Sequence, residues 1–165
     1  MTVANYFIDT EHESIADFDS GFSVFNDYLK QKSDSAVMHY IVEVETDVLI
    51  AYFSLLSSAA IGGELSNIDV VPAIELKMFA LDKRFQKKGI AAILLESVVK
   101  VIERYALECV GANIILLYSV PVDAVVNLYD KCGFRQASGI FVTYKSPFNQ
   151  GCIPMYKILD NSEFA

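Results

Sequence analysis

A cluster of basic residues stands immediately before the strongest helical pattern of the chain. Four bases fall within six positions, at Lys83, Arg84, Lys87 and Lys88. Gly89 follows them, and apolar residues then recur in steps of three and four, which predicts an amphipathic helix over about residues 88–109. The free amides of a first helical turn, the helix dipole and adjacent lysines all favour a bound anion. Because Gly89 lets an anion approach the backbone closely, this segment is a candidate pyrophosphate site.

Other common kinds of chemical site have little support. The chain has neither the GxxxxGK[ST] nor the GxGxxG pattern of nucleotide-binding loops, and it lacks the GxSxG pattern of hydrolases. Its two histidines, His12 and His39, lie in no metal-ligand spacing, so we expect no metal site. The three cysteines, Cys109, Cys132 and Cys152, are widely spaced and odd in number, which favours reduced thiols.

Length and composition predict one globular domain. The 165 residues are 53% hydrophobic, with a mean hydropathy of +0.36, which is enough apolar surface for a full core. We expect a single domain over residues 1–165, with a frayed tail at 161–165. No apolar run reaches the roughly 18 residues of a membrane span, and the N-terminus lacks the pattern of a secretion signal. These features favour a cytoplasmic protein without membrane association.

Charge is distributed unevenly. The net charge is −8, and residues 1–69 carry twelve of the 21 acids but only two of the 13 bases. An acidic balance disfavours extensive binding to nucleic acid, which usually needs a broad basic surface. The acidic charge of residues 1–69 has three possible roles: it keeps the protein soluble, it attracts a cation, or it binds a basic partner.

The elements that must position the basic turn alternate between strands and helices. We expect strands at residues 3–8, 38–45, 48–57, 73–81, 112–120, 134–144 and 153–159. Helices are expected at 22–33, 88–109 and 122–132. The strands at 38–45 and 48–57 should form a hairpin, and residues 62–69 should form a loop. The apolar stripe of the long helix comprises Ile90, Leu94, Val98, Val101, Tyr105 and Cys109.

Two segments resemble signatures of the GNAT superfamily of N-acetyltransferases. Residues 86–91 (QKKGIA) are similar to its Q/R-x-x-G-x-G/A acyl-coenzyme A signature, and residues 127–134 (NLYDKCGF) are similar to its LYxKxGF segment. Residues 79–82 (FALD) resemble the family's fourth strand. The resemblance covers residues 3–159 and implies a GNAT-type α/β fold. In that fold, helices flank a mixed central sheet of about six or seven strands, with a splay between the fourth and fifth strands.

A closer resemblance is to the branch that contains toxin acetyltransferases acting on aminoacyl-tRNA. Residues 18–30 and 81–86 carry that likeness. It suggests a homodimer and, for a toxin, a small antitoxin partner.

The resemblance also implies roles for individual residues, with acetyl-CoA as co-substrate. Backbone amides would hold its pyrophosphate, at Gln86, Lys87, Lys88, Gly89, Ile90, Ala91 and Ala92. The end of the fourth strand would pair with the pantetheine arm and polarise the acetyl carbonyl, through the backbone of Phe79, Ala80 and Leu81. Tyr129 would protonate the departing thiolate. Glu75 would take a proton from the attacking amine, directly or through water.

Each of these two catalytic roles has a structural alternative. Tyr129 suits the core-facing side of an amphipathic helix, and glutamates such as Glu75 are common on exposed strands. Lys77, two residues after Glu75, either lowers the pKa of Glu75 or is simply solvated. The sequence also departs from the family's pattern, because Pro121 stands where many relatives have Asn and Ala91 stands where Gly is commoner.

We therefore predict an enzyme that transfers acetyl from acetyl-CoA to a primary amine by direct attack in a ternary complex. The acceptor is left open among a small cationic amine, a protein amine and an aminoacyl-tRNA. The alternative is a non-catalytic module of the same fold that binds acyl-CoA or another protein.

Overall fold

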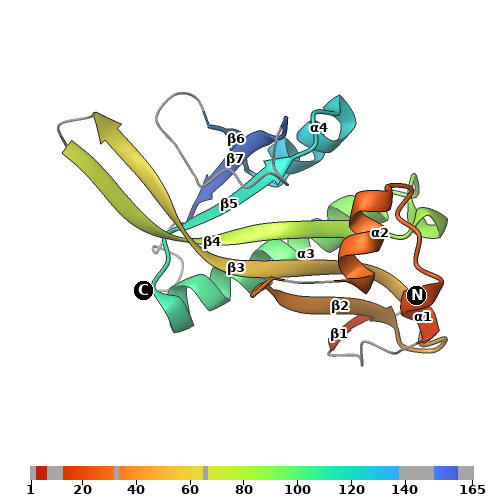
Figure 1. Ribbon diagram of the computed structural model, residues 1–165. Coiled ribbons are helices and arrows are strands. Elements are labelled where there is room, and N and C mark those ends of the chain that lie inside the picture. The colour runs from red at the N-terminus through yellow and green to blue at the C-terminus, as the bar shows by residue number, and fades with distance from the viewer. Residues whose placement is uncertain (1–2, 7–12, 32–33, 65–66, 138–150, 160–165) are drawn as a thin grey trace. The chain divides into compact units, whose positions relative to one another are not determined.

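The computed structural model describes residues 3–6, 13–31, 34–64, 67–137 and 151–159, which form two compact units. The first unit comprises Met1–Leu56 and Leu76–Ala91, and the second comprises Ser57–Glu75 and Ala92–Ala165. The hydrogen-bonded strand order is β1-β2-β3-β4-β5-β7-β6 (Figure 1). Strands β3 (Leu49–Glu64) and β4 (Asn67–Leu81) each contribute residues to both units. A single domain over residues 1–165 stays a prediction.

The first unit contains an antiparallel meander. Strand β1 (Val3–Tyr6) pairs with β2 (Val37–Glu43), and β2 pairs with β3, both antiparallel. The register places Tyr40 opposite Tyr52, and it shifts between Ile41 and Val42. The predicted hairpin is therefore confirmed, and its turn closes where the Asp47 amide donates to the Glu43 carbonyl at 2.9 Å.

Two short helices cover one face of this sheet. Helix α1 (Glu13–Ala16) and helix α2 (Ser23–Lys30) lie against the strands, as Figure 1 shows for α2. The Tyr52 hydroxyl donates to the Phe25 carbonyl at 2.7 Å, and the Phe18 ring meets the Tyr52 ring edge-on at 5.5 Å. The buried members of this core are Ile15, Phe18, Tyr28, Leu29, Met38, Tyr40, Val42, Leu49, Tyr52, Met78 and Ala80. Each large apolar side chain among them contributes about 1.5–3 kcal/mol by leaving water.

The second unit joins parts of β3 and β4 to the C-terminal strands. Strand β5 (Ile114–Ser119) pairs antiparallel with β7 (Ile153–Ile158), which pairs antiparallel with the short β6 (Arg135–Gln136). Helix α3 (Ile90–Tyr105) continues into a π-helical turn (Ala106–Val110), and α4 (Asp123–Lys131) follows β5. The Lys157 ammonium contacts Glu103 Oε1 at 2.9 Å and donates to the Cys132 carbonyl at 3.3 Å, so it links β7 to both helices.

Several expectations about the elements were wrong. The expected loop at 62–69 is largely strand, because β3 runs to Glu64 and β4 begins at Asn67. Helix α1 was missed, since its single turn carries no apolar repeat. The stripe on α3 is confirmed only in part: Leu94 and Val98 are buried as expected, but Tyr105 and Cys109 are exposed. Leu95, Val99 and Ile102 are buried in addition. The expected strand at 134–144 begins at Arg135, and its part beyond residue 137 lies outside the described residues, as does the tail at 161–165.

Membrane association can be tested only on the helices that the structure describes. Among residues 3–6, 13–31, 34–64, 67–137 and 151–159, no helix combines the length and the apolar character that crossing a membrane requires.

Candidate active site

The connection between β4 and α3 has an unusual backbone. Asp82 caps a 3-10 turn (Lys83–Phe85) by accepting a hydrogen bond from the Arg84 amide at 2.9 Å. Lys87 (φ 59°) and Gly89 (φ 73°) are left-handed, immediately before α3 begins at Ile90. A left-handed Lys is uncommon and costs conformational energy, so the surrounding contacts must hold it in place.

Backbone amides are available at this turn. The Gln86 amide donates to the Lys83 carbonyl at 3.3 Å, so the donors without an intrahelical partner begin beyond Gln86. The first four amides of α3 have no carbonyl one turn earlier to accept them. A Cβ placed on Gly89 would meet no atom within 4 Å, so space is open beside the backbone there. The chain around Gly89 therefore fits an anion that approaches its amides closely.

Two of the four clustered bases are used within the protein. Lys83 Nζ lies 2.5 Å from Asp19 Oδ2, and Arg84 Nε and Nη2 donate to the two oxygens of Asp82 at 2.8 and 2.9 Å. The contact with Lys83 is the largest cause that holds the pKa of Asp19 well below its ordinary value.

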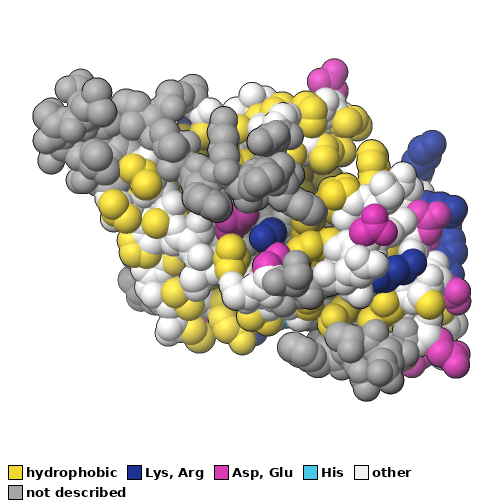
Figure 2. Space-filling model, viewed as in Figure 1, with side chains coloured by type: hydrophobic (Ala, Val, Ile, Leu, Met, Phe, Trp, Pro, Cys, Tyr) yellow, Lys and Arg dark blue, Asp and Glu magenta, His cyan; other side chains and the backbone are white. Residues whose placement is uncertain are grey.

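Lys87 and Lys88 are the bases of the cluster that remain for a ligand. Both are exposed, and neither forms an ion pair with a carboxylate among the residues that the structure describes. The Lys88 ammonium lies 5.9 Å from the centre of the Phe85 ring, which orients it by a cation–π contact. In Figure 2, basic side chains gather at the right-hand edge of the molecule, where Figure 1 places the β4–α3 connection.

The end of β4 leads directly into this turn. Ala80 and Leu81 are buried and Phe79 is half-buried, and Ala80 packs into the core of the first unit. The Asp82 amide donates to the Ile50 carbonyl at 2.8 Å, which fixes the strand end against β3. Phe79 to Ala91 therefore lie together in the first unit, whereas Ala92 is the first helical residue of the second.

Tyr129 is held by the turn that follows α4. The Cys132 and Phe134 amides both donate to the Tyr129 carbonyl, at 3.0 and 3.1 Å, and Gly133 (φ 85°) permits that tight return. The Tyr129 ring is buried and meets the Phe134 ring edge-on at 5.8 Å. Burial raises the pKa of the Tyr129 phenol far above its ordinary value, so the phenol stays protonated at neutral pH.

Glu75 is a buried carboxylic acid on β4 in the second unit, with 9% of its surface exposed. Burial and the charge of Glu75 together raise the pKa of Tyr118, on β5, to about 12. Of the two alternatives for Lys77, simple solvation is wrong. The Lys77 ammonium forms an ion pair with Asp34 at 2.9 Å and is only 16% exposed.

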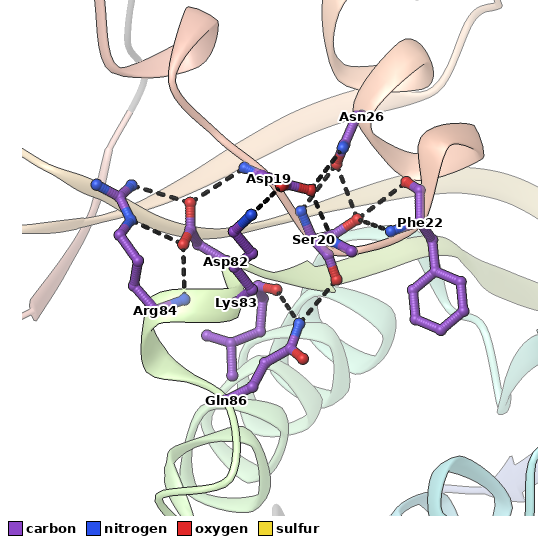
Figure 3. Close-up of polar contacts among 10 residues, drawn as sticks. Asp19, Ser20, Phe22, Asn26, Asp82, Lys83, Arg84 and Gln86 are labelled. Atoms are coloured by element: carbon purple, nitrogen blue, oxygen red, sulfur yellow. Dashed lines mark hydrogen bonds and ion pairs between the residues drawn. The ribbon is translucent and has the colours of Figure 1, made fainter.

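A further polar network was not foreseen from the sequence. It joins residues 19–26 to residues 81–86, as Figure 3 shows, and its members are Asp19, Ser20, Phe22, Asn26, Leu81, Asp82, Lys83, Arg84 and Gln86. For residues 18–30 the sequence indicated a helix from residue 22 and a likeness to the toxin branch, and neither assigned the segment a role in the site. No local pattern connects segments so far apart in the sequence.

Known proteins share this architecture. A bacterial toxin of known structure has a TM-score of 0.76 at 16% identity, covering 96% of this chain and 91% of the toxin. The AtaTR structure bound with AcCoA has a TM-score of 0.75 at 15% identity, with coverages of 98% and 96%. AtaT in complex with acetyl-methionyl-tRNAfMet has a TM-score of 0.69 at 14% identity, with coverages of 99% and 97%. At these identities the likeness shows the fold, which is the mixed α/β architecture expected from the sequence.

A match between the amino-acid sequence and a family model shows the family to which the protein belongs. The model of the acetyltransferase (GNAT) family matches residues 5–134, which include β4, the basic turn, α3, Glu75 and Tyr129. This match spans most of the chain, so the protein belongs to the acetyltransferase (GNAT) family.

Proposed function

We propose that this chain transfers the acetyl group of acetyl-CoA to a primary amine by direct attack in a ternary complex. The observation that carries the proposal is the β4–α3 turn, with its left-handed Lys87 and Gly89, its open backbone and its two exposed lysines, which form no ion pair with any carboxylate of the described residues. Family membership supplies the class of reaction. The acetyl-CoA-bound AtaTR structure supports the choice of donor.

The pyrophosphate would be held by the turn and the start of α3. The amides from Lys87 to Ala92 would donate to its oxygens, while Lys87 and Lys88 would add positive charge. The contribution expected from the Gln86 amide is reduced, because that amide already donates to Lys83. The backbone of Phe79, Ala80 and Leu81 would align the pantetheine arm and polarise the acetyl carbonyl.

The reaction needs two proton movements. As the amine nitrogen bonds to the thioester carbon, the carbon–sulfur bond breaks and the sulfur leaves as a thiolate. Tyr129 would donate its phenolic proton to that thiolate, because a phenol is protonated at neutral pH. Glu75 would accept the proton that the amine loses, directly or through water.

The need for Glu75 depends on the acceptor. At pH 7, removing the proton from a lysine-type amine with a pKa of about 10.4 costs about 4.6 kcal/mol of free energy. The same step costs only about 1.1 kcal/mol for an α-amine with a pKa of about 7.8. A base is therefore nearly essential for the first acceptor and optional for the second.

Charge and the comparisons support two candidate classes of acceptor. A net charge of −8 favours a cationic amine, such as a polyamine or a lysine side chain. The complex of AtaT with acetyl-methionyl-tRNAfMet favours the α-amine of an aminoacyl-tRNA as a second candidate. For that candidate, the AtaT structure with the antitoxin AtaR suggests an antitoxin partner. We also propose that the protein forms a homodimer and is located in the cytoplasm.

Thiol release from acetyl-CoA tests the proposal. The acceptors are a polyamine, a lysine-containing peptide and a charged tRNA, with wild type compared against Tyr129→Phe. We expect release with at least one acceptor, together with an acetylated product detected by mass spectrometry. Coenzyme binding without thiol release for every acceptor would instead indicate a non-catalytic module of this fold.

A further inference from the structure

The turn that would carry the coenzyme is fixed by a segment about sixty residues earlier in the chain. The Lys83 amide donates to the Asp19 carbonyl at 2.8 Å, and the Asp19 amide donates to Asp82 Oδ2 at 3.1 Å. The Gln86 side chain then reaches the Ser20 carbonyl at 2.9 Å. Residues 19–20 therefore run along the chain from Leu81 to Gln86 and bond to it at three places (Figure 3).

Asp82 is the most buried charged group of this network, with 1% of its surface exposed. Its two oxygens accept four hydrogen bonds, from the Asp19 amide and from the Arg84 amide, Nε and Nη2. A buried carboxylate is costly unless it is paired and fully hydrogen-bonded, so this geometry tolerates little movement. The 3-10 turn is consequently anchored at its N-cap residue.

Gln86 anchors the other end of the same turn. Its Nε2 donates to the Ser20 carbonyl at 2.9 Å and to the Leu81 carbonyl at 2.8 Å. Ser20 is itself fixed, because its amide and its hydroxyl both donate to Asn26 Oδ1, at 2.9 and 2.8 Å. The residue directly before the left-handed Lys87 is thus tied to both β4 and the start of α2.

We infer that Asp82 and Gln86 are positioning residues, which hold the β4–α3 turn in its phosphate-binding conformation before acetyl-CoA arrives. The inference rests on the proposed function. Lys87 adopts a conformation that its neighbours must impose, and the two anchors lie on the residues that lead into it. A turn that is ordered before binding loses less conformational entropy when the coenzyme binds. The contacts of Asp82 and Gln86 should therefore increase the affinity for the coenzyme.

A merely stabilising network would behave differently. It would lower the melting temperature when broken, but well below that temperature the coenzyme affinity and the local order of the turn would be unchanged. In a positioning network, the coenzyme affinity depends on the local order of the turn. Breaking either anchor should weaken coenzyme binding and, in the coenzyme-free protein, speed amide hydrogen exchange at residues 83–91.

The variants Asp82→Asn and Gln86→Ala break the two anchors separately. Asp123→Asn and Gln136→Ala are matched controls, because both residues are exposed and lie in the second unit. Calorimetry gives the dissociation constant of acetyl-CoA at a temperature where each variant is folded. Hydrogen exchange by mass spectrometry follows residues 83–91, and thiol release at saturating coenzyme gives kcat. If Asp82→Asn does not fold, Gln86→Ala carries the test, since Gln86 is neutral and only half-buried.

We expect the dissociation constant to rise about tenfold to 10²-fold in both anchor variants, as for a misplacement of a binding group by about 1 Å. Faster exchange at residues 83–91 should accompany this rise, and the controls should match wild type in coenzyme affinity, exchange and kcat. An unchanged dissociation constant, or weaker binding without faster exchange, would overturn the inference while leaving the proposed function intact. A wild-type protein that does not bind acetyl-CoA would overturn the proposed function, and the inference with it.

Discussion

At the scale of single residues, the two proposed proton carriers differ in what burial does for them. Tyr129 is buried against Phe134, and burial keeps its phenol protonated across the physiological range. Glu75 is also buried, and its charge, together with burial, raises the pKa of Tyr118 to about 12. In the proposed mechanism, Tyr129 gives a proton and Glu75 accepts one.

Replacing Tyr129 by Phe removes the hydroxyl and keeps the ring. We expect kcat to fall by about 10²–10⁴-fold, the usual contribution of a positioned general acid. The dissociation constant of acetyl-CoA and the melting temperature should change little, because the ring contact with Phe134 persists. Steady-state kinetics and calorimetry on the same preparation check this. If coenzyme affinity fell as much as kcat, Tyr129 would have a packing role.

Replacing Glu75 by Gln tests the proposed base through the choice of acceptor. At pH 7 the loss of kcat/KM should be more than about tenfold greater for a lysine ε-amine than for an α-amine, because the former must lose its proton at a much higher cost. The measurement compares two acceptors that differ only in the kind of amine. Glu108→Gln is the matched control on an exposed glutamate of the second unit. An equal loss of kcat/KM for both amines would show that Glu75 does not accept the proton of the amine.

At the scale of elements, the β4–α3 turn combines left-handed backbone with open space. Gly89 and Gly111 are both left-handed, at φ 73° and 69°, and a Cβ at either position would meet no atom within 4 Å. Gly89 precedes a helix and Gly111 follows one. They therefore form a matched pair in which only Gly89 belongs to the proposed site.

Replacing each of these glycines by Ala separates stability from binding. Both variants should lose about 1–2 kcal/mol of unfolding free energy, the cost of a left-handed residue with a Cβ. Only Gly89→Ala should also weaken acetyl-CoA binding. Denaturant unfolding and calorimetry give the two quantities, and equal affinities in both variants would count against a phosphate site at this turn.

The anchor at Asp82 predicts a pH dependence of stability. Burial alone would raise the pKa of Asp82, but hydrogen bonds from Arg84 and Asp19 outweigh it and hold that pKa below its ordinary value. A carboxyl whose pKa is lower in the folded state stabilises the protein above the unfolded pKa of about 3.9, and this contribution is lost as the pH falls through the folded pKa.

Asp82→Asn should therefore be less stable than wild type at pH 7, with the difference narrowing as the pH falls below about 4. Denaturant unfolding at a series of pH values measures it. Asp19 and Asp34 also have lowered pKa values, so both proteins should still lose some stability in acid. A difference that stays constant with pH would show that the Asp82 charge is not what stabilises the turn.

Local patterns predicted most of the elements but not the contacts between distant segments. Alternation of apolar residues identified the β2–β3 hairpin, and Gly89 marked the start of α3. The buried face of α3 was predicted only in part, because apolar residues lie on more than one side of that helix. The sequence alone does not specify which of these sides packs against the rest of the protein. The anchoring of Gln86 by Ser20 was out of reach, since nothing in either segment specifies a partner sixty-six residues away.

At the scale of the whole molecule, family and fold agree while the acceptor depends on surface chemistry. Residues 5–134 match the acetyltransferase (GNAT) family, and the same architecture occurs in toxins of known structure. The net charge of −8 differs from the basic surface that extended RNA contact favours. A cationic acceptor is consistent with that charge, whereas a charged tRNA would have to be engaged through basic groups other than Lys87 and Lys88, which the proposal assigns to the coenzyme.

The central claim is that the β4–α3 turn binds acetyl-CoA, and the most direct test is the melting temperature with and without it. At a coenzyme concentration 100 times the dissociation constant, linkage predicts about 2.7 kcal/mol of stabilisation, or a rise of about 5–10 °C for a chain of this size. We expect that rise in wild type. Gly89→Glu should show none, because it places a negative charge where the pyrophosphate would lie, provided its own melting transition is intact. No rise in wild type at millimolar coenzyme, or an equal rise in Gly89→Glu, would contradict the account.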